Sequence, residues 1–163
     1  MKKAGVLTMS DKGSLGLRTD LSGPVIAEIL KGLGISVEIS EIIPDDLDII
    51  KERLLSLCDE NRLDLIVTTG GTGLSPRDVT PDATLMVIEK RIPGMEEVMR
   101  MESLKKTPHA MISRAVVGVR KTTLIVNVPG SPKGARECLE SIAKALPHAL
   151  DKLGGDMSDC AQP

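Results

Sequence analysis

Residues 63–82 read LDLIVTTGGTGLSPRDVTPD, and they join three predicted elements of structure. Residues 63–68 are apolar and partly β-branched, which is typical of a buried strand. The glycines of TTGGTG end this strand. Thr80, Pro81 and Asp82 then begin a helix, because they supply a capping hydroxyl, a proline for the first turn and an acid near the positive end of the helix dipole. A strand, a glycine-rich loop and a helix therefore follow one another.

The same alternation extends outward from this unit in both directions. We predict further strands over residues 3–9, 36–43, 115–120 and 123–128, and helices over residues 22–32, 47–58, 80–91, 95–106 and 133–146. Continuation of the last helix to residue 153 is the alternative. Strands that alternate with helices predict an α/β fold with three layers, in which a doubly wound, mostly parallel sheet has helices on both faces. We expect a single domain over residues 1–154 and a frayed C-terminal tail over residues 155–163.

The composition limits the kinds of site that the protein can contain. Of the 163 residues, 41% are hydrophobic, 27% are charged and none is Phe, Trp or Tyr. The chain can therefore form a folded core, but it cannot stack bases on aromatic rings or cage cations between them. A net charge of −2 also argues against a protein that coats nucleic acid.

The cysteines and the apolar segments indicate the cellular compartment. Three cysteines without a CxxC pair favour reduced thiols over a disulfide framework or a zinc site. The apolar run at the N-terminus is too short for a signal peptide, and no run approaches the length that spans a membrane. We therefore expect a cytoplasmic protein that contacts neither a membrane nor nucleic acid.

Charge is unevenly distributed along the chain. Residues 1–99 contain 11 basic and 17 acidic side chains, whereas residues 100–138 contain 8 basic and 2 acidic ones. A positive zone on an acidic protein favours a small anionic ligand. Scattered, solvated lysines are an equally good explanation of the same counts.

Polar segments follow the predicted strands. Ser10-Asp11 follows the first strand, Pro44-Asp45-Asp46 the second and Gly70–Gly73 the third, while Asn127 and Pro129-Gly130-Ser131 lie at the end of the last. The carboxyl ends of parallel strands lie at one edge of a sheet, where such folds bind their ligands. We therefore expect these four segments to meet at a single edge.

The glycine-rich segment has the composition of a phosphate-binding loop. Its glycines, Gly70, Gly71 and Gly73, allow close approach of the backbone, and successive amides in such a turn can bind phosphate. Hydroxyls from Thr69, Thr72 and Ser75 and the guanidinium of Arg77 add further anion ligands. Neither GxxxxGK[ST] nor GxGxxG is present. A tight turn between strand and helix remains the alternative for the glycines alone.

Two acids are candidates for metal binding. Asp45 follows the second strand and Asp78 lies among the anion-binding groups, so together they could hold Mg²⁺ against phosphate oxygens. Helix capping is the alternative for each of them. Ser10 and Asp11, with Ser14, Asp20 and Ser22 in the same loop, could contact a sugar, a base or a polar ring, and loop composition is the alternative. Ser113-Arg114 could hold a phosphate, and a solvated surface is the alternative.

The chain resembles the molybdenum-cofactor biosynthesis family, which includes molybdopterin adenylyltransferases, MoaB-type proteins and the G domains of gephyrin. The resemblance covers nearly the whole chain and rests on TTGGTGLSPRDVTPDAT, with SDKGSLGLRTDLSG, IIPDD, ESLKKTPHAMISRA and LIVNVPGSPKGARECLE in the same order. It implies a molybdopterin-binding α/β domain, usually trimeric, in which the terminal phosphate of molybdopterin attacks the α-phosphate of ATP with Mg²⁺ and releases pyrophosphate. It also implies cytoplasmic molybdenum cofactor biosynthesis and contact with a molybdate-inserting protein.

The resemblance assigns roles to particular residues. Asp45 and Asp78 correspond to the family's catalytic and metal-binding carboxylates. Gly70–Gly73, Ser113 and Asn127–Ser131 resemble the family's contacts to nucleotide or pterin. Together with the residues singled out above, the candidate contacts are Ser10, Asp11, Thr69, Gly70, Gly71, Thr72, Gly73, Ser75, Arg77, Ser113, Arg114, Asn127, Pro129, Gly130 and Ser131. Because the chain has no aromatic residues, we expect Met, Ile, Val or Pro side chains to pack against the rings of both substrates.

Two alternatives to the adenylyltransferase remain. One is a pterin-binding or scaffold module without catalysis, as in MoaB-type relatives, and fold alone does not decide between them. The other is a nucleotide hydrolase that needs no pterin. Retention of both acids favours the enzyme.

Overall fold

The computed structural model describes residues 1–156. Their six-stranded sheet has the order β2-β1-β3-β6-β5-β4. The strands are β1 (Lys3–Met9), β2 (Ser36–Ile43), β3 (Leu65–Thr69), β4 (Lys90–Arg91), β5 (Val117–Arg120) and β6 (Thr123–Val128). β1 pairs in parallel with β2 and β3, and β3 with β6, whereas β4–β5 and β5–β6 are antiparallel. The prediction of a mostly parallel sheet is confirmed.

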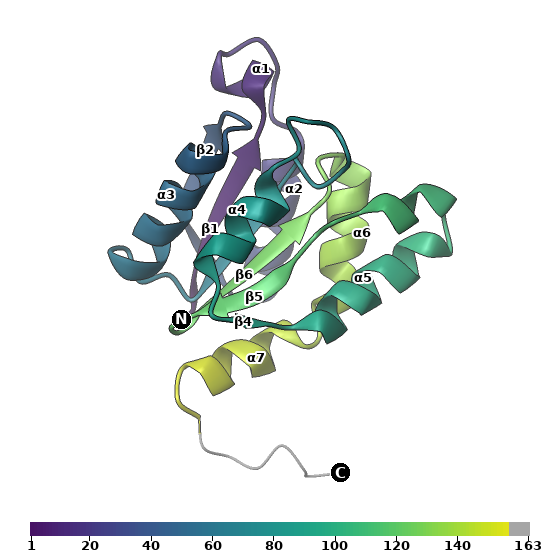
Figure 1. The fold of residues 1–163 in the computed structure, drawn as a ribbon. Helices are drawn as coiled ribbons and strands as arrows, with labels where there is room; N and C mark the ends of the chain where they lie inside the picture. Colours follow the sequence, from purple (N-terminus) through teal and green to yellow (C-terminus); the bar gives the residue numbers. More distant parts are fainter. Residues whose placement is uncertain (157–163) are drawn as a thin grey trace.

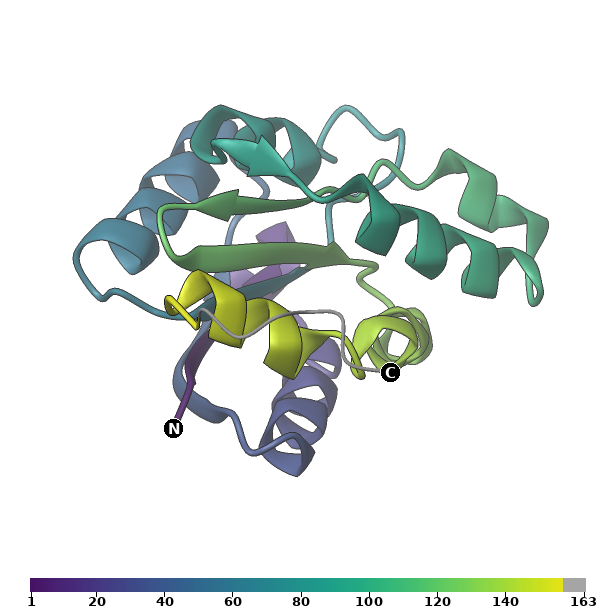
Figure 2. The same ribbon diagram turned by 90° about the horizontal axis from the view of Figure 1, so that it is seen from below.

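Helices cover both faces of this sheet, as predicted (Figure 1). The helices are α1 (Asp11–Ser14), α2 (Ser22–Gly32), α3 (Leu47–Asp59), α4 (Thr80–Val87), α5 (Pro93–Leu104), the 3-10 helix η1 (Pro108–Ile112), α6 (Pro132–Ile142) and α7 (Leu146–Leu153). Figure 2 shows α3 and α4 on one side of the sheet and α2, α6 and α7 on the other. No helix within residues 1–156 has the length and hydropathy that crossing a bilayer requires.

Two separate hydrophobic cores follow from the alternation of side chains along the strands. Leu65 and Val67 of β3 pack in the core that α2, α6 and α7 complete. Ile66, between them, points to the opposite face and packs in the core beneath α3 and α4. β3 is fully buried on both faces, which is why its sequence is a continuous apolar run rather than an alternating one.

The structure differs from the prediction at the edge of the sheet. The helix predicted to continue to residue 91 ends at Val87, because Glu89 and Ile92 donate backbone hydrogen bonds to β5 on either side of β4. Pro93 and Gly94 do not interrupt the chain but form the first turn of α5. These boundaries depend on pairing with a strand that is distant along the chain, which local sequence does not reveal.

Shorter elements also differ from the prediction. α1 lies in what we expected to be a loop, and η1 was not expected. The last predicted helix is two, α6 and α7, with a break after Ile142. Of the tail predicted over residues 155–163, residues 157–163 lie outside the described part of the chain.

Candidate functional site

The expected convergence of the polar segments is confirmed. A cavity of about 720 Å³ lies at the carboxyl ends of the parallel strands. Its lining includes Asp45 after β2, Gly70 and Gly71 after β3, and Asp78 before α4. Ser10, Asp11, Thr69, Gly130 and Ser131 also line it. Four segments that are far apart in sequence therefore form one site, which we call the acidic cavity.

A second cavity of about 260 Å³ lies beside the same loop. Thr72 and Gly73 line it, together with Ser113, Pro129 and Ser131. Much of the remaining lining is aliphatic or sulfur-containing, from Met99, Ala110, Ile112, Ala115 and Cys138. We call it the apolar cavity. The glycine-rich loop and Ser131 contribute to both cavities, so ligands in the two would be close neighbours.

The conformation of the loop requires glycine at two positions. Gly70 has φ +99° and Gly71 has φ +66°, values that other residues rarely adopt. A Cβ atom on Gly70 would lie 2.6 Å from the carbonyl oxygen of Met9, and one on Gly71 would collide with Oγ1 of Thr80. The Thr80 hydroxyl donates to the carbonyl of Gly70 over 3.0 Å. The first turn of α4 thus fixes the loop closely against β1.

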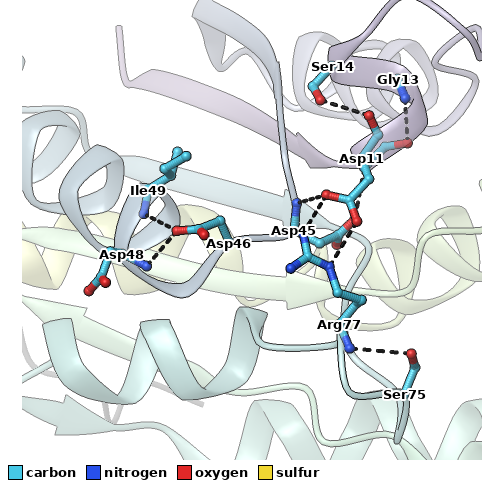
Figure 3. A network of polar contacts seen from close by, with 10 residues as sticks. Asp11, Gly13, Ser14, Asp45, Asp46, Asp48, Ile49, Ser75 and Arg77 are labelled. Atoms are coloured by element: carbon cyan, nitrogen blue, oxygen red, sulfur yellow. Dashed lines mark hydrogen bonds and ion pairs between the residues drawn. The ribbon is translucent and has the colours of Figure 1, made fainter.

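Asp11 connects Asp45 to Arg77, as Figure 3 shows. The amide of Asp11 donates to Oδ2 of Asp45, and the amide of Asp45 donates to Oδ1 of Asp11, each over 3.0 Å. The guanidinium of Arg77 donates to both Asp11 oxygens, from Nε over 3.0 Å and from Nη2 over 2.7 Å. The segments after β1 and β2 and the glycine-rich loop are therefore held together by one carboxylate.

The acids of the cavity have opposite electrostatic environments. Hydrogen bonds from Arg77 lower the pKa of Asp11. Burial raises the pKa of Asp45, and the nearby negative charges of Asp11 and Asp78 add to the effect, while the amide of Asp11 and the charge of Arg77 oppose it. Ionised Asp45 would therefore be stabilised by a cation in the cavity.

The donor set fits Mg²⁺ bound together with phosphate. Within residues 1–156, no group of three or more His, Cys, Asp or Glu side chains is arranged to hold a metal ion alone. Mg²⁺ commonly takes one or two carboxylates and completes its shell with water and phosphate oxygens. Asp45 and Asp78, which face one cavity, provide that number of carboxylates.

Asp46 and Asp78 also show how the protein uses its carboxylates locally. Asp46 accepts from the amides of Asp48 and Ile49, so it caps α3, as expected from the alternative interpretation of this segment. Oδ2 of Asp78 accepts from the amide of Ser75 over 2.9 Å and therefore stabilises the loop that carries it. Asp78 combines this local role with a place in the cavity wall.

Arg114 contacts the loop from outside the acidic cavity. Its guanidinium donates to the carbonyl oxygens of Gly73 and Asp78 and pairs with the carboxylate of Asp82. Its backbone amide donates to the carbonyl of Thr72 over 2.9 Å. The structure thus places this side chain against the protein's own backbone, where it holds the glycine-rich loop in position.

A sequence profile described as a probable molybdopterin binding domain matches residues 5–148. The chain belongs to this family. It is 47% identical over 154 residues to the molybdopterin adenylyltransferase of Helicobacter pylori strain J99, covering 93% of this chain and 88% of the relative. The Escherichia coli K12 protein of the same name is 43% identical over 145 residues, which cover 88% of this chain and 74% of the relative. The crystal structure of MoaB from Thermus thermophilus superposes with a TM-score of 0.90 at 49% identity, covering 96% of this chain and 98% of the MoaB chain.

In this member of the molybdopterin binding domain family, some predicted residues support the site rather than line it. Asn127 is fully buried. Its amide donates to the hydroxyls of Thr68 and Thr84, and its oxygen accepts from the amide of Val116. The expectation that its side chain contacts substrate does not fit this position. Thr69 does both: it lines the acidic cavity, and its hydroxyl donates to the carbonyl of Pro129 and so links β3 to the loop after β6.

The remaining predicted residues have mixed positions. Ser10 and Ser131 cap α1 and α6 through hydrogen bonds from Gly13 and Gly134, and both line the acidic cavity. Ser75 accepts a long hydrogen bond, 3.4 Å, from the amide of Arg77. Ser113 lines the apolar cavity.

Further residues of the segment after β1 line the acidic cavity, and Lys12 and Arg18 among them were missed from the sequence. Asp20 accepts from the hydroxyl of Thr8 and from the amides of Ser22 and Gly23, so it caps α2 at the cavity wall. Asp20 was among the loop residues expected to contact a sugar, a base or a polar ring, whereas its capping of α2 was not predicted. Lys12 and Arg18 also line the cavity, and no local pattern distinguishes them from other exposed cations.

Proposed function

We propose that this protein is a molybdopterin adenylyltransferase, which transfers AMP from ATP to the phosphate of molybdopterin and releases pyrophosphate. The observation that carries the proposal is that Asp45 and Asp78 face one cavity beside a glycine-rich loop. The names and identities of its adenylyltransferase relatives support the same reaction.

The reaction exchanges one phosphoanhydride bond for another. An oxygen of the molybdopterin phosphate forms a bond to the α-phosphorus of ATP, and the bond from that phosphorus to the bridging oxygen of the β-phosphate breaks. The electron pair leaves with pyrophosphate. Phosphoryl transfer of this kind needs positioning and charge stabilisation more than covalent chemistry from the protein.

The chain supplies both requirements from its own residues. The backbone at Gly70 and Gly71 lines the cavity without side chains, so a phosphate can approach it closely. Asp45 and Asp78 would hold Mg²⁺ against the phosphates. When bound, the ion neutralises charge on the phosphate oxygens and fixes their geometry. Asp11 keeps the amide and carboxylate of Asp45 in place.

The apolar cavity supports a role in holding a flat ring. Met99, Ile112 and Pro129 line it, and these are the types of side chain that a protein without Phe, Trp or Tyr can place against a ring. Because the two cavities share the glycine-rich loop and Ser131, two substrates bound in them would meet at the loop.

We extend the proposal to the protein's assembly and setting. It works as one domain over residues 1–154, as a homotrimer in the cytoplasm, and hands its product to a molybdate-inserting protein. Sedimentation equilibrium tests the assembly, since a trimer has three times the mass of the 17.4 kDa chain.

The reaction is tested by incubating the protein with molybdopterin, ATP and Mg²⁺ and measuring pyrophosphate and adenylyl-molybdopterin. We expect both products in equal amounts. Binding of molybdopterin without either product would instead indicate a binding module. Pyrophosphate released without molybdopterin would indicate a nucleotide hydrolase.

A further inference from the structure

The acidic side chains around the acidic cavity would repel the negatively charged ligand that we propose for it. Four acidic side chains line the cavity: Asp11, Asp20, Asp45 and Asp78. Under the proposed function a triphosphate enters the same space. A metal ion offsets only part of this negative charge, so basic side chains are needed as well.

Arg77, the cation that the sequence favours for this task, is already engaged. Its guanidinium forms two hydrogen bonds with the carboxylate of Asp11, in the bidentate geometry that a phosphate would otherwise receive. It is not among the residues that line the cavity. Asp11 and Arg77 therefore act as a neutral pair that holds the wall.

Lys12 and Arg18 are the basic side chains that do line the cavity. Both residues are exposed, and neither side chain forms an ion pair or a hydrogen bond with another residue in the described part of the chain. Their charges are therefore available to a ligand, whereas those of Arg77 and Arg114 are paired with Asp11 and Asp82.

The segment that carries these two residues is anchored at both ends. Asp11 is bound to Asp45 at one end, and Asp20 caps α2 at the other. Between them, Gly16 takes a positive φ of +72°, and the amide of Leu17 donates back to the carbonyl of Lys12. Figure 1 shows this segment, around α1, beyond the end of the sheet at which β1 terminates.

We propose that Lys12 and Arg18 bind the phosphates of ATP in the acidic cavity, while Arg77 remains paired with Asp11. This inference rests on the proposed function, because it assumes that the triphosphate occupies this cavity. It assigns the positive charge to the segment after β1, and not to the glycine-rich loop.

The test is calorimetric titration of MgATP in the absence of molybdopterin, so that no turnover occurs. We expect K12Q and R18Q each to raise Kd by roughly three- to tenfold, as for exposed charge-assisted contacts. The double variant should bind more weakly than either. The difference from wild type should shrink at about 0.5 M NaCl, where the screening length falls to about 4 Å.

The matched control is K144Q, which removes the same charge from an exposed position outside both cavities. It should bind MgATP as the wild type does. A wild-type Kd in the double variant would overturn this inference, and so would an equal loss in K144Q. Wild-type protein that binds no MgATP would overturn the proposed function together with it.

Discussion

Asp78 has both a structural and a proposed catalytic role. Its carboxylate accepts a hydrogen bond from Ser75, which stabilises the loop, and it faces the acidic cavity. We expect Asp78→Asn to lower kcat about 10²–10³-fold, the usual effect of losing one preorganised electrostatic group, about 2.7–4 kcal/mol. The kcat of the variant is measured from the steady-state rate of pyrophosphate release. Asp46→Asn is the control, since asparagine caps a helix as well as aspartate does and Asp46 does not line the cavity. Equal rates for the two variants would remove Asp78 from the mechanism.

Asp45 is expected to lower the stability of the folded protein, and its proposed role in metal binding explains why an acid is present there. Because burial raises its pKa in the folded state, ionised Asp45 destabilises the fold at neutral pH. We expect Asp45→Asn to raise Tm at pH 7 in metal-free buffer. The gain should vanish below the ordinary carboxyl pKa of 3.8, where the acid is protonated in both states. Thermal unfolding at neutral pH and below this pKa tests the expectation.

The same substitution should affect the proposed metal. We expect Asp45→Asn to increase the Mg²⁺ concentration needed for half-maximal pyrophosphate release. An unchanged Mg²⁺ titration, or a lower Tm at pH 7, would contradict the role given to Asp45.

Arg114 is expected to position the loop. Lysine keeps the charge but cannot reach Gly73, Asp78 and Asp82 at once, as the guanidinium does. We expect Arg114→Lys to lower kcat up to about a hundredfold, because small displacements of reacting groups have effects of this size, with little change in KM for ATP. A large rise in KM at unchanged kcat would instead indicate that Arg114 binds phosphate directly.

At the scale of elements, the loop between β3 and α4 depends on Gly71. Alanine there would be strained at φ +66° and would collide with Thr80, so we expect Gly71→Ala to destabilise the fold by about 1–3 kcal/mol. Gly32, the last residue of α2, has open space around it, and Gly32→Ala should be neutral or stabilise by up to about 1 kcal/mol. Urea unfolding compares the two. Similar values for both variants would contradict the account of the loop.

α3 is joined to the β5–β6 hairpin by an ion pair with its own pH dependence. Hydrogen bonds from Arg120 and Lys121 lower the pKa of Asp59, at the end of α3, to about 2. The stability that this pair contributes is present above pH 3.8 and is lost as pH falls through 2. We expect Asp59→Asn to lower Tm at pH 7 and to have a smaller effect at pH 2. Equal effects at both pH values would show that the charge is not responsible.

Local patterns predicted most of these elements because each strand and helix carries its own periodicity and its own end signals. They could not predict β4, whose pairing with β5 depends on residues far away in sequence. Local patterns also predicted that Arg77 binds phosphate. They could not reveal its ion pair with Asp11, because Asp11 is 66 residues away in the sequence. In the sequence, Asn127 is a polar residue at the end of a predicted strand. The three-dimensional structure was needed to show that it is buried and bonded to the hydroxyls of Thr68 and Thr84.

At the scale of the whole molecule, parallel strands explain why separate polar segments form one site. Their carboxyl ends share an edge, so the convergence of Asp45, Asp78 and the glycine-rich loop follows from topology once the strand order is fixed. Which group pairs with which depends on the detailed register and on side-chain length, and this required the structure.

The central claim is that adenylyl transfer takes place where the two acids and the glycine-rich loop meet. A crystal structure with MgATP bound tests it most directly. We expect the α-phosphate against the amides of Gly70 and Gly71, with the metal ion on the carboxylates of Asp45 and Asp78. A nucleotide whose α-phosphate lies away from this loop, with neither carboxylate near its metal ion, would contradict the account.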